Sequence, residues 1–284
     1  MKKILVVLLV AFAVTLTACA SPAAPAPAPT TPPAAGGTAE PAEQPAVEPG
    51  ERPVIVMGTA ATFPPFEFVA GPGQGRHGQY SGIDIAIGMR IAEHIGADLE
   101  IRDTQFASLI VELQSGMIDF IAAAMTITEA RALEVNFSDP YFTATQYILV
   151  HVDNDEIHSV ADLAGQHVGV QLGSTGDIFV TNYVDAADIL RYERSMEGVM
   201  DLMNGAIDAF VLDSAVAMLW AGEHESLRYV ADHDATALEF YGIAVNMDNP
   251  ELLAQINEVI AMMVEENYVE SLFEYYAIAL AGND

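Results

Sequence analysis

The spacing of apolar and polar residues predicts alternating helices and strands from residue 54 to the end of the chain. Between Ile83 and Ile95 apolar residues recur at helical spacing, and Gly96 follows where a helix-ending glycine belongs. Further helices are predicted over residues 107–114, 176–184, 196–203, 251–266 and 268–280, with Asn267 in a left-handed conformation between the last two. Short apolar runs predict strands over residues 54–57, 99–101, 118–124, 146–150, 166–170, 207–212 and 241–245. This alternation predicts an α/β architecture with largely parallel sheets.

One short pattern occurs twice. Residues 116–119 (GMID) link a predicted helix to a predicted strand, and residues 205–208 (GAID) repeat this arrangement 89 residues later. The repeat predicts two lobes that are built alike. Because ligands of open α/β sheets bind outside the carboxyl ends of the strands, residues 124–126 and Asp213 are expected to face one cleft. The aspartate that ends each motif, Asp119 or Asp208, is interpreted as structural, binding nearby backbone amides.

In the first lobe, polar residues after the strand indicate a site for an anion. Thr126 and Glu129 match a capping box, which predicts a helix start with free backbone N–H groups. Arg131 follows within this helix and offers a planar fork of donors to a carboxylate. The alternative is an arginine that pairs with one of the 40 acidic residues of the chain.

In the second lobe, residues 171–176 (QLGSTG) again lead from a strand to a helix start, where an anion binds favourably. Asp213 ends an apolar strand without a partner nearby in the sequence, so it is expected to bind a cationic group of a ligand. Together these groups predict a pocket for an α-amino acid. Phe63, Phe66 and Phe106 are candidate walls of this pocket, and a place in the ordinary core is their alternative.

The N-terminal sequence has the pattern of a secretory signal peptide over residues 1–18, with two lysines, a short apolar run and small residues. Residues 16–19 (LTAC) resemble a bacterial lipobox, so Cys19 is expected to carry lipid. An ordinary signal peptide with an incidental cysteine is the alternative. Residues 19–53, rich in Pro and Ala, are expected to form a tether. The sequence thus predicts an extracytoplasmic protein, attached to the cell membrane through a lipid anchor only.

The amino-acid composition argues against several classes of binding partner. The chain has 40 Asp and Glu against 10 Lys and Arg, a formal net charge of -30 at pH 7. Such a surface repels phosphate groups, so we expect no binding to nucleic acid and no electrostatic docking on membranes. The single cysteine excludes an internal disulfide and a cysteine-rich metal site. The seven histidines show no metal-ligand spacing, so we expect neither a metal nor a cofactor.

Several short segments resemble one known family. They are FPPFEF (63–68), GID (82–84), MTIT (125–128) with Arg131, FSDPY (137–141), DLAG (162–165), VGV (168–170), GSTG (173–176) and YGIAV (241–245). In this order they resemble the bacterial extracellular solute-binding proteins of the polar amino-acid type, family 3. The resemblance covers about residues 54–279.

This resemblance implies a two-lobed, periplasmic-binding-protein-like fold of type II with a central cleft. Two hinge strands are expected near residues 146–150 and 240–245. The first lobe would comprise residues 54–147 and 241–284, and the second lobe residues 148–240.

The resemblance also implies roles for individual residues. Arg131 would bind the α-carboxylate with the N–H groups of Thr126 and Thr175, and Asp213 would bind the α-ammonium with the carbonyl of Ala124. Aromatic residues would enclose the ligand side chain, and Gln171 would help to recognise it. The complete set of expected ligand-binding residues is Phe63, Phe66, Phe106, Ala124, Met125, Thr126, Arg131, Gln171, Ser174, Thr175 and Asp213.

These expectations describe a monomeric, non-enzymatic substrate-binding subunit of an ABC importer. It would capture a polar or neutral amino acid by cleft closure and deliver it to a membrane permease. Ala60 stands where relatives that bind cationic amino acids often carry an acid, which favours an uncharged side chain. The alternative is a dehydratase-like enzyme of the same fold acting on a small amino acid or carboxylate, although the sequence shows no nucleophile–base pair. A sensor module is a third, less favoured interpretation.

Overall fold

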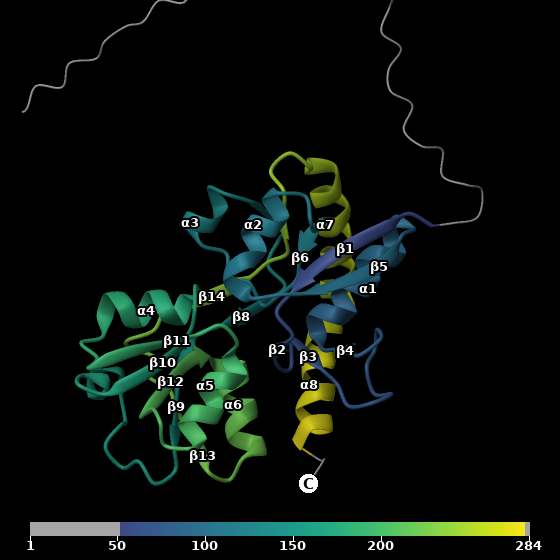
Figure 1. Cartoon of the computed structure of the whole chain (residues 1–284). Coiled ribbons are helices and arrows are strands. Elements are labelled where there is room, and N and C mark those ends of the chain that lie inside the picture. The colour runs from purple at the N-terminus through teal and green to yellow at the C-terminus, as the bar shows by residue number, and fades with distance from the viewer. Residues whose placement is uncertain (1–51, 282–284) are drawn as a thin grey trace, which may run out of the picture. The chain divides into compact units, whose positions relative to one another are not determined.

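The structure is a computed structural model that describes residues 52–281. The expected signal peptide, Cys19 and nearly all of the expected tether lie outside the described residues. The described residues form two five-stranded sheets, one three-stranded sheet and a two-stranded ribbon. Figure 1 shows the two large sheets in separate lobes, each with its own helices. The predicted two-lobed α/β architecture is confirmed. The expectation of largely parallel sheets is wrong, because both large sheets are mixed.

The first large sheet joins two distant stretches of the chain. Its order is β5 (Asp98–Asp103), β1 (Val54–Thr59), β6 (Phe120–Ile121), β15 (Ala244–Val245) and β7 (Asn136–Phe137). Strand β1 pairs in parallel with β5 and β6, whereas β15 pairs antiparallel with β6 and β7. The carboxyl ends of β1, β5 and β6 therefore meet at one edge of the sheet.

The second large sheet repeats much of this plan. Its order is β11 (Asp188–Tyr192), β10 (His167–Gln171), β12 (Ala209–Asp213), β9 (Gln146–His151) and β13 (Leu227–Val230). Strand β10 pairs in parallel with β11 and β12, and β9 pairs antiparallel with β12 and β13. Gln171 and Asp213 thus lie at the carboxyl ends of neighbouring parallel strands.

Helices cover both sheets (Figure 1). The first lobe carries α1 (Ile83–Ile95), the 3-10 turn η1 (Phe106–Ser108), α2 (Leu109–Gln114), α3 (Glu129–Ala132), α7 (Pro250–Glu265) and α8 (Tyr268–Ala281). The second lobe carries the 3-10 turn η2 (Val160–Leu163), α4 (Thr175–Tyr183), α5 (Ser195–Met203) and α6 (Ser214–Glu223). Gly96 and Asn267 take the left-handed conformation expected at their helix ends, with φ of 73° and 51°. Within residues 52–281, no helix has the length and apolar character needed to cross a membrane.

A two-stranded ribbon connects the lobes. It pairs β8 (Phe142–Ala144) antiparallel with β14 (Glu239–Tyr241), each of which lies in sequence between a strand of one large sheet and a strand of the other. The first connection lies just before the expected hinge segment 146–150, and the second overlaps the start of the expected segment 240–245. Residues 146–150 belong to β9 inside the second sheet, and the expected strand at 241–245 is divided between β14 and β15. A small antiparallel sheet of β2 (Thr62–Phe63), β3 (Glu67–Val69) and β4 (Tyr80–Ser81) flanks the first lobe.

The two copies of the internal repeat make the same hydrogen bonds in the structure. Oδ2 of Asp119 accepts a hydrogen bond from the N–H of Val56 at 2.7 Å, and Oδ2 of Asp208 accepts one from the N–H of His167 at 2.8 Å. The backbone N–H of each aspartate donates in return to the carbonyl of the same partner. The glycine that starts each motif has φ of 73° or 72°. Both aspartates therefore tie a loop to the neighbouring parallel strand, which confirms their structural interpretation.

Candidate ligand-binding site

A pocket lies between the two lobes, where the carboxyl ends of strands from both large sheets meet. Its lining residues are Phe63, Glu67, Phe106, Ala123, Ala124, Thr126, Arg131, Gln171, Ser174, Thr175, Ser195, Phe210, Val211, Leu212 and Asp213. The structure brings together all of the residues expected from the sequence except Phe66 and Met125. The matching strand ends of the two repeats thus contribute to one pocket, as the repeat predicted.

Phe66 and Met125 belong to the core instead. Phe66 is completely buried, and its ring packs edge-on against Phe142 and Tyr241, with centroids 4.9 and 5.1 Å apart. Met125 is buried in an apolar cluster of the first lobe. Its neighbours Ala124 and Thr126 line the pocket, whereas Met125 does not.

The helix start next to the pocket differs from the expected capping box. Helix α3 is a single turn, and its N-cap is Thr128, whose Oγ1 accepts a hydrogen bond from the N–H of Arg131 at 3.2 Å. Thr126 pairs with Tyr241 in an isolated β-bridge, and its hydroxyl donates to Glu239 at 2.8 Å. Thr126 is therefore an extended residue before the helix and not its cap.

Arg131 is a buried cation that contacts both lobes. Its side chain donates to the carbonyl of Thr126 at 2.7 Å and, across the cleft, to the carbonyl of Gly173 at 3.0 Å. The guanidinium carbon lies 5.2 Å from the centre of the Phe106 ring. Burial lowers the pKa of Arg131, and the negative charges of the nearby acidic residues oppose this shift. Its hydrogen-bond acceptors are backbone carbonyls and not a carboxylate, which contradicts the alternative of an arginine paired with an acidic residue.

Asp213 is buried but not without partners. The phenol of Tyr241 and the side-chain amide of Gln146 both donate hydrogen bonds to it. Burial, followed by the negative charge of Glu239, raises the pKa of Asp213 to about 7, although these hydrogen bonds and Arg131 favour the ionised form. As the sequence indicated, no partner of this carboxylate lies nearby in the sequence, because both partners come from distant strands.

Glu239 was missed by the sequence analysis. It lies on β14 of the connecting ribbon, and its Oε2 accepts hydrogen bonds from the hydroxyls of Thr126 at 2.8 Å and Thr175 at 2.7 Å. Its Oε1 accepts one from Gln146 at 3.1 Å. One carboxylate thus links a residue of each lobe to the ribbon. The only sequence signal was its position beside an expected hinge strand.

The second lobe presents a capped helix start to the pocket. Ser174 is the N-cap of α4, and its Oγ accepts a hydrogen bond from the N–H of Asp177 at 3.1 Å. Ser174 and Thr175 line the pocket beside Gln171, which ends β10. The first N–H groups of a helix carry partial positive charge, so this end of the pocket is suited to an anion.

Ala124 holds an unusual backbone conformation in the pocket. Its φ is 45°, a left-handed value that costs a non-glycine residue about 1–2 kcal/mol. Its N–H donates to the buried Asp84 at 2.7 Å, and the hydroxyl of Tyr141 donates to the same carboxylate at 2.9 Å. Burial raises the pKa of Asp84 to about 7. Asp84 therefore holds the backbone turn between β6 and the ligand-facing residues.

Glu67 is a second site residue that the sequence analysis did not identify. Only 1% of its surface is exposed, it lines the pocket, and its Oε2 has no hydrogen-bond partner. Burial and, after it, the charges of Asp84 and Asp213 raise the pKa of Glu67 well above its usual value. An unsatisfied buried oxygen costs about 1–3 kcal/mol, so this carboxyl is suited to a hydrogen bond with a ligand.

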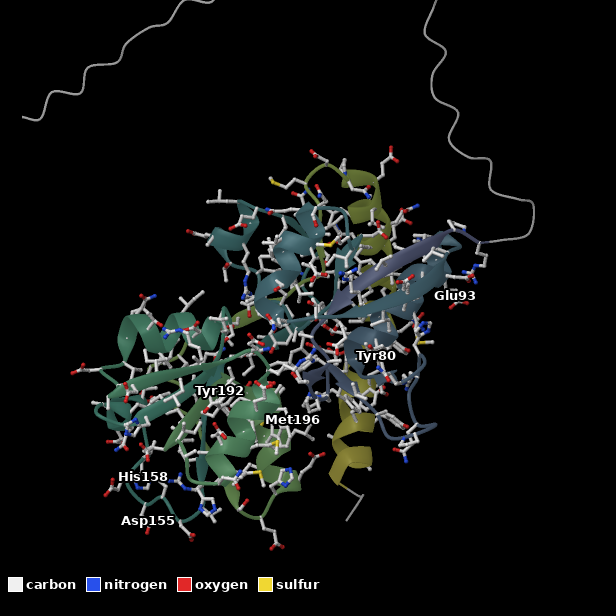
Figure 2. The ribbon with its side chains drawn as sticks, in the orientation of Figure 1. Tyr80, Glu93, Asp155, His158, Tyr192 and Met196 are labelled. Atoms are coloured by element: carbon white, nitrogen blue, oxygen red, sulfur yellow. The ribbon has the colours of Figure 1, made fainter. Side chains whose placement is uncertain are left out.

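The structure also bears on metal binding. Across residues 52–281, no cluster of three or more His, Cys, Asp or Glu side chains has the arrangement to hold a metal ion. The histidines are dispersed; Figure 2 shows His158 on the second lobe next to Asp155, whose carbonyl lies 2.9 Å from the imidazole Nε2.

Two lobes joined by a ribbon, with a polar pocket between them, define a solute-binding protein of the periplasmic type. Residues 55–278 match the family of bacterial extracellular solute-binding proteins, family 3, and the chain belongs to this family. The resemblance stated from the short segments is confirmed.

Individual relatives of this chain are binding proteins for amino acids. The ABC transporter glutamine-binding protein GlnH of Bacillus subtilis is 33% identical over 69% of this chain and 72% of its own length. The L-cystine-binding protein TcyJ of Escherichia coli is 28% identical over 78% of this chain and 81% of its own length. The structure of a mutant of ArgBP from T. maritima matches with a TM-score of 0.72 and 37% identity, over 78% of this chain and 94% of that one.

Proposed function

We propose that this protein is the substrate-binding subunit of an ABC importer and captures a polar or neutral α-amino acid by cleft closure. The observation that carries this proposal is the presence of buried Arg131 and buried Asp213 in one pocket, each from a different lobe. A ligand with both a carboxylate and an ammonium matches this pair, and binding it engages both lobes at once. Contacts with both lobes favour the closed form.

The two charged groups of the ligand have separate places in the pocket. The guanidinium of Arg131 and the N-terminus of α4 at Thr175 bind the carboxylate. The ammonium binds between Asp213 and Glu239, both of which accept hydrogen bonds from neighbouring side chains. The carbonyl of Ala124 completes this end of the pocket.

The remaining lining residues select the ligand side chain. Phe63 and Phe106 provide apolar walls, and Gln171 adds a polar amide. The raised pKa of Glu67 favours its protonated form, which both donates and accepts a hydrogen bond. A neutral side chain with donor and acceptor atoms, such as a carboxamide, satisfies both requirements. Among the relatives, one is named as a glutamine-binding protein.

The proposal extends to the setting of the protein. The chain acts as a monomer outside the cytoplasm, held at the cell membrane by lipid on Cys19, and its closed form delivers the ligand to a permease. Replacing Cys19 with Ala should abolish incorporation of labelled palmitate and release the protein from the membrane fraction. Retained membrane attachment in this variant would contradict the lipid anchor and leave the ligand proposal intact.

A thermal-shift screen of the protein against the twenty amino acids tests the ligand proposal. A ligand at 100 times its dissociation constant stabilises the folded state by about 2.7 kcal/mol, which raises the melting temperature by several degrees. We expect such a shift for one or a few polar or neutral amino acids and for the wild type only, with Arg131→Ala as the control. No shift with any amino acid would overturn the proposal.

A further inference from the structure

We propose that Glu193 and Arg194 latch the second lobe to the first and strengthen amino-acid binding without touching the ligand. With the neighbouring Ser195 they form the interlobe strip, three consecutive residues that each bind the first lobe. This inference rests on the proposed function, because it concerns the same pocket. Ser195 lines the pocket, whereas Glu193 and Arg194 do not, and the inference gives these two residues a part in setting the ligand affinity.

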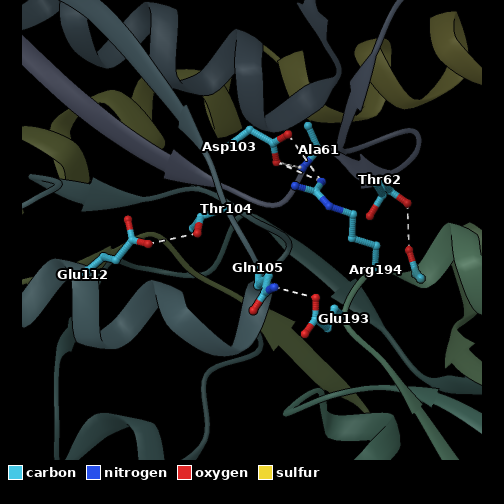
Figure 3. Close-up of polar contacts among 9 residues, drawn as sticks. Ala61, Thr62, Asp103, Thr104, Gln105, Glu112, Glu193 and Arg194 are labelled. Atoms are coloured by element: carbon cyan, nitrogen blue, oxygen red, sulfur yellow. Dashed lines mark hydrogen bonds and ion pairs between the residues drawn. The ribbon is translucent and has the colours of Figure 1, made fainter.

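The contacts of the interlobe strip are direct (Figure 3). The side-chain amide of Gln105 donates a hydrogen bond to Glu193. The guanidinium of Arg194 donates to both oxygens of Asp103, at 3.2 and 3.3 Å. The buried hydroxyl of Ser195 donates to the carbonyl of Thr62 at 2.7 Å.

The topology explains why these segments meet. Strands β5 and β11 are the edge strands of their sheets, and both run parallel to their neighbours. The residues at or just after their carboxyl ends, 103–105 and 193–195, therefore emerge on the edges that border the cleft. Figure 2 labels Tyr192 and Met196, which flank the strip on the side of the second lobe that faces the first.

The first-lobe partners of the strip adjoin the walls of the pocket. Asp103 also accepts a hydrogen bond from the N–H of Ala61 at 3.0 Å, so it holds the segment that leads into Phe63. Gln105 directly precedes Phe106 in the sequence. The latch therefore holds both aromatic walls in place when the lobes are closed.

The burial of the ion pair gives it a measurable effect. The side chains of Arg194 and Asp103 are 32% and 17% exposed, so solvent screens this pair less than a fully exposed one. A contact made only between closed lobes shifts the equilibrium toward the closed form. The apparent affinity for a ligand rises with the population of that form. Loss of the latch should therefore weaken binding through faster dissociation of the ligand.

Two variants remove the ion pair from opposite sides. Arg194→Gln removes the cation, and Asp103→Asn removes the charge while keeping an oxygen for the N–H of Ala61. Each should weaken binding of L-glutamine or L-arginine about fivefold in calorimetric titration, and the double variant should be no weaker than either single one. High salt should weaken binding by the wild type more than binding by Arg194→Gln.

Arg102→Gln is the matched control, because Arg102 adjoins Asp103 but pairs with Glu112 inside the first lobe, at 2.7 Å. It should leave the affinity unchanged. Equal affinity of the wild type, Arg194→Gln and Asp103→Asn would overturn the latch, as would an equal loss in Arg102→Gln.

If the wild type binds neither probe, the latch is tested without a ligand. Fluorescence energy transfer between dyes at Val111→Cys and Tyr183→Cys, in a chain with Cys19→Ser, reports on closure because these exposed positions lie on different lobes. Arg194→Gln should lower the transfer efficiency of the ligand-free protein. Equal transfer efficiencies in the labelled protein with Arg194 and in the labelled Arg194→Gln variant would overturn the proposal.

Discussion

The protonation state of Asp213 should make amino-acid binding depend on pH. This carboxyl is buried beside Glu239, and its pKa is raised to about 7 in the protein without ligand. An ammonium group pairs with the ionised carboxylate and not with the neutral acid. A ligand therefore binds either to the ionised form of Asp213 or with release of the proton from its neutral form. The affinity should rise as the pH rises through 7, the direction expected for an acid whose raised pKa falls on binding a cation.

The magnitude follows from the ionised fraction. With a pKa of about 7, roughly half of the Asp213 carboxyls are ionised at pH 7 and about one in a hundred at pH 5. The dissociation constant at pH 5 should therefore be about 50-fold larger than at pH 7, and at pH 8 about twofold smaller than at pH 7. At pH 6, binding should release about one proton per ligand.

Calorimetric titration from pH 5 to pH 8, in two buffers with different ionisation enthalpies, measures both quantities. Asp213→Asn should bind weakly at every pH and release no proton. Glu239→Gln removes a neighbouring negative charge, which lowers the pKa of Asp213, so its midpoint should move to lower pH. A dissociation constant that stays the same in the wild type from pH 5 to pH 8 would refute the assignment of Asp213 to the ammonium.

Four further substitutions test the site and the fold. Arg131→Met should weaken amino-acid binding by at least about 100-fold, since a buried pair broken on one side loses about 3–5 kcal/mol, with an unchanged circular dichroism spectrum; retained affinity would contradict its role. Asp119→Ala and Asp208→Ala should each lower the free energy of unfolding in urea by about 1 kcal/mol through equivalent lost hydrogen bonds, and a loss in only one would contradict the structural repeat. Tyr276→Phe removes a hydroxyl with three hydrogen-bond partners and should cost about 2 kcal/mol of stability without changing ligand affinity.

Local patterns in the sequence were sufficient for much of the fold. The helical spacing of α1 and the glycine after it act over a few residues, so they predict that helix without knowledge of its neighbours. The repeated GMID and GAID motifs were likewise enough to indicate two similar lobes and structural roles for their aspartates. The strand ends of this repeat also placed Thr126 and Asp213 at one cleft, where the structure finds them.

Other features depend on which side chains from distant segments meet. Glu239 binds the pocket residues Thr126 and Thr175 only because the ribbon brings β14 beside them. Thr128 caps α3 in place of Thr126 because Thr126 is held in an isolated bridge.

The sequence by itself determined the alternation of elements, the two lobes and most of the residues of the pocket, because periodicity and turn chemistry are local properties. Only the tertiary structure decided that Met125 faces the core, that Glu67 is a buried acid in the pocket and that Arg194 reaches the opposite lobe. Burial, pKa values and contacts between lobes depend on the packing of segments far apart in the chain. No short window of sequence contains that information.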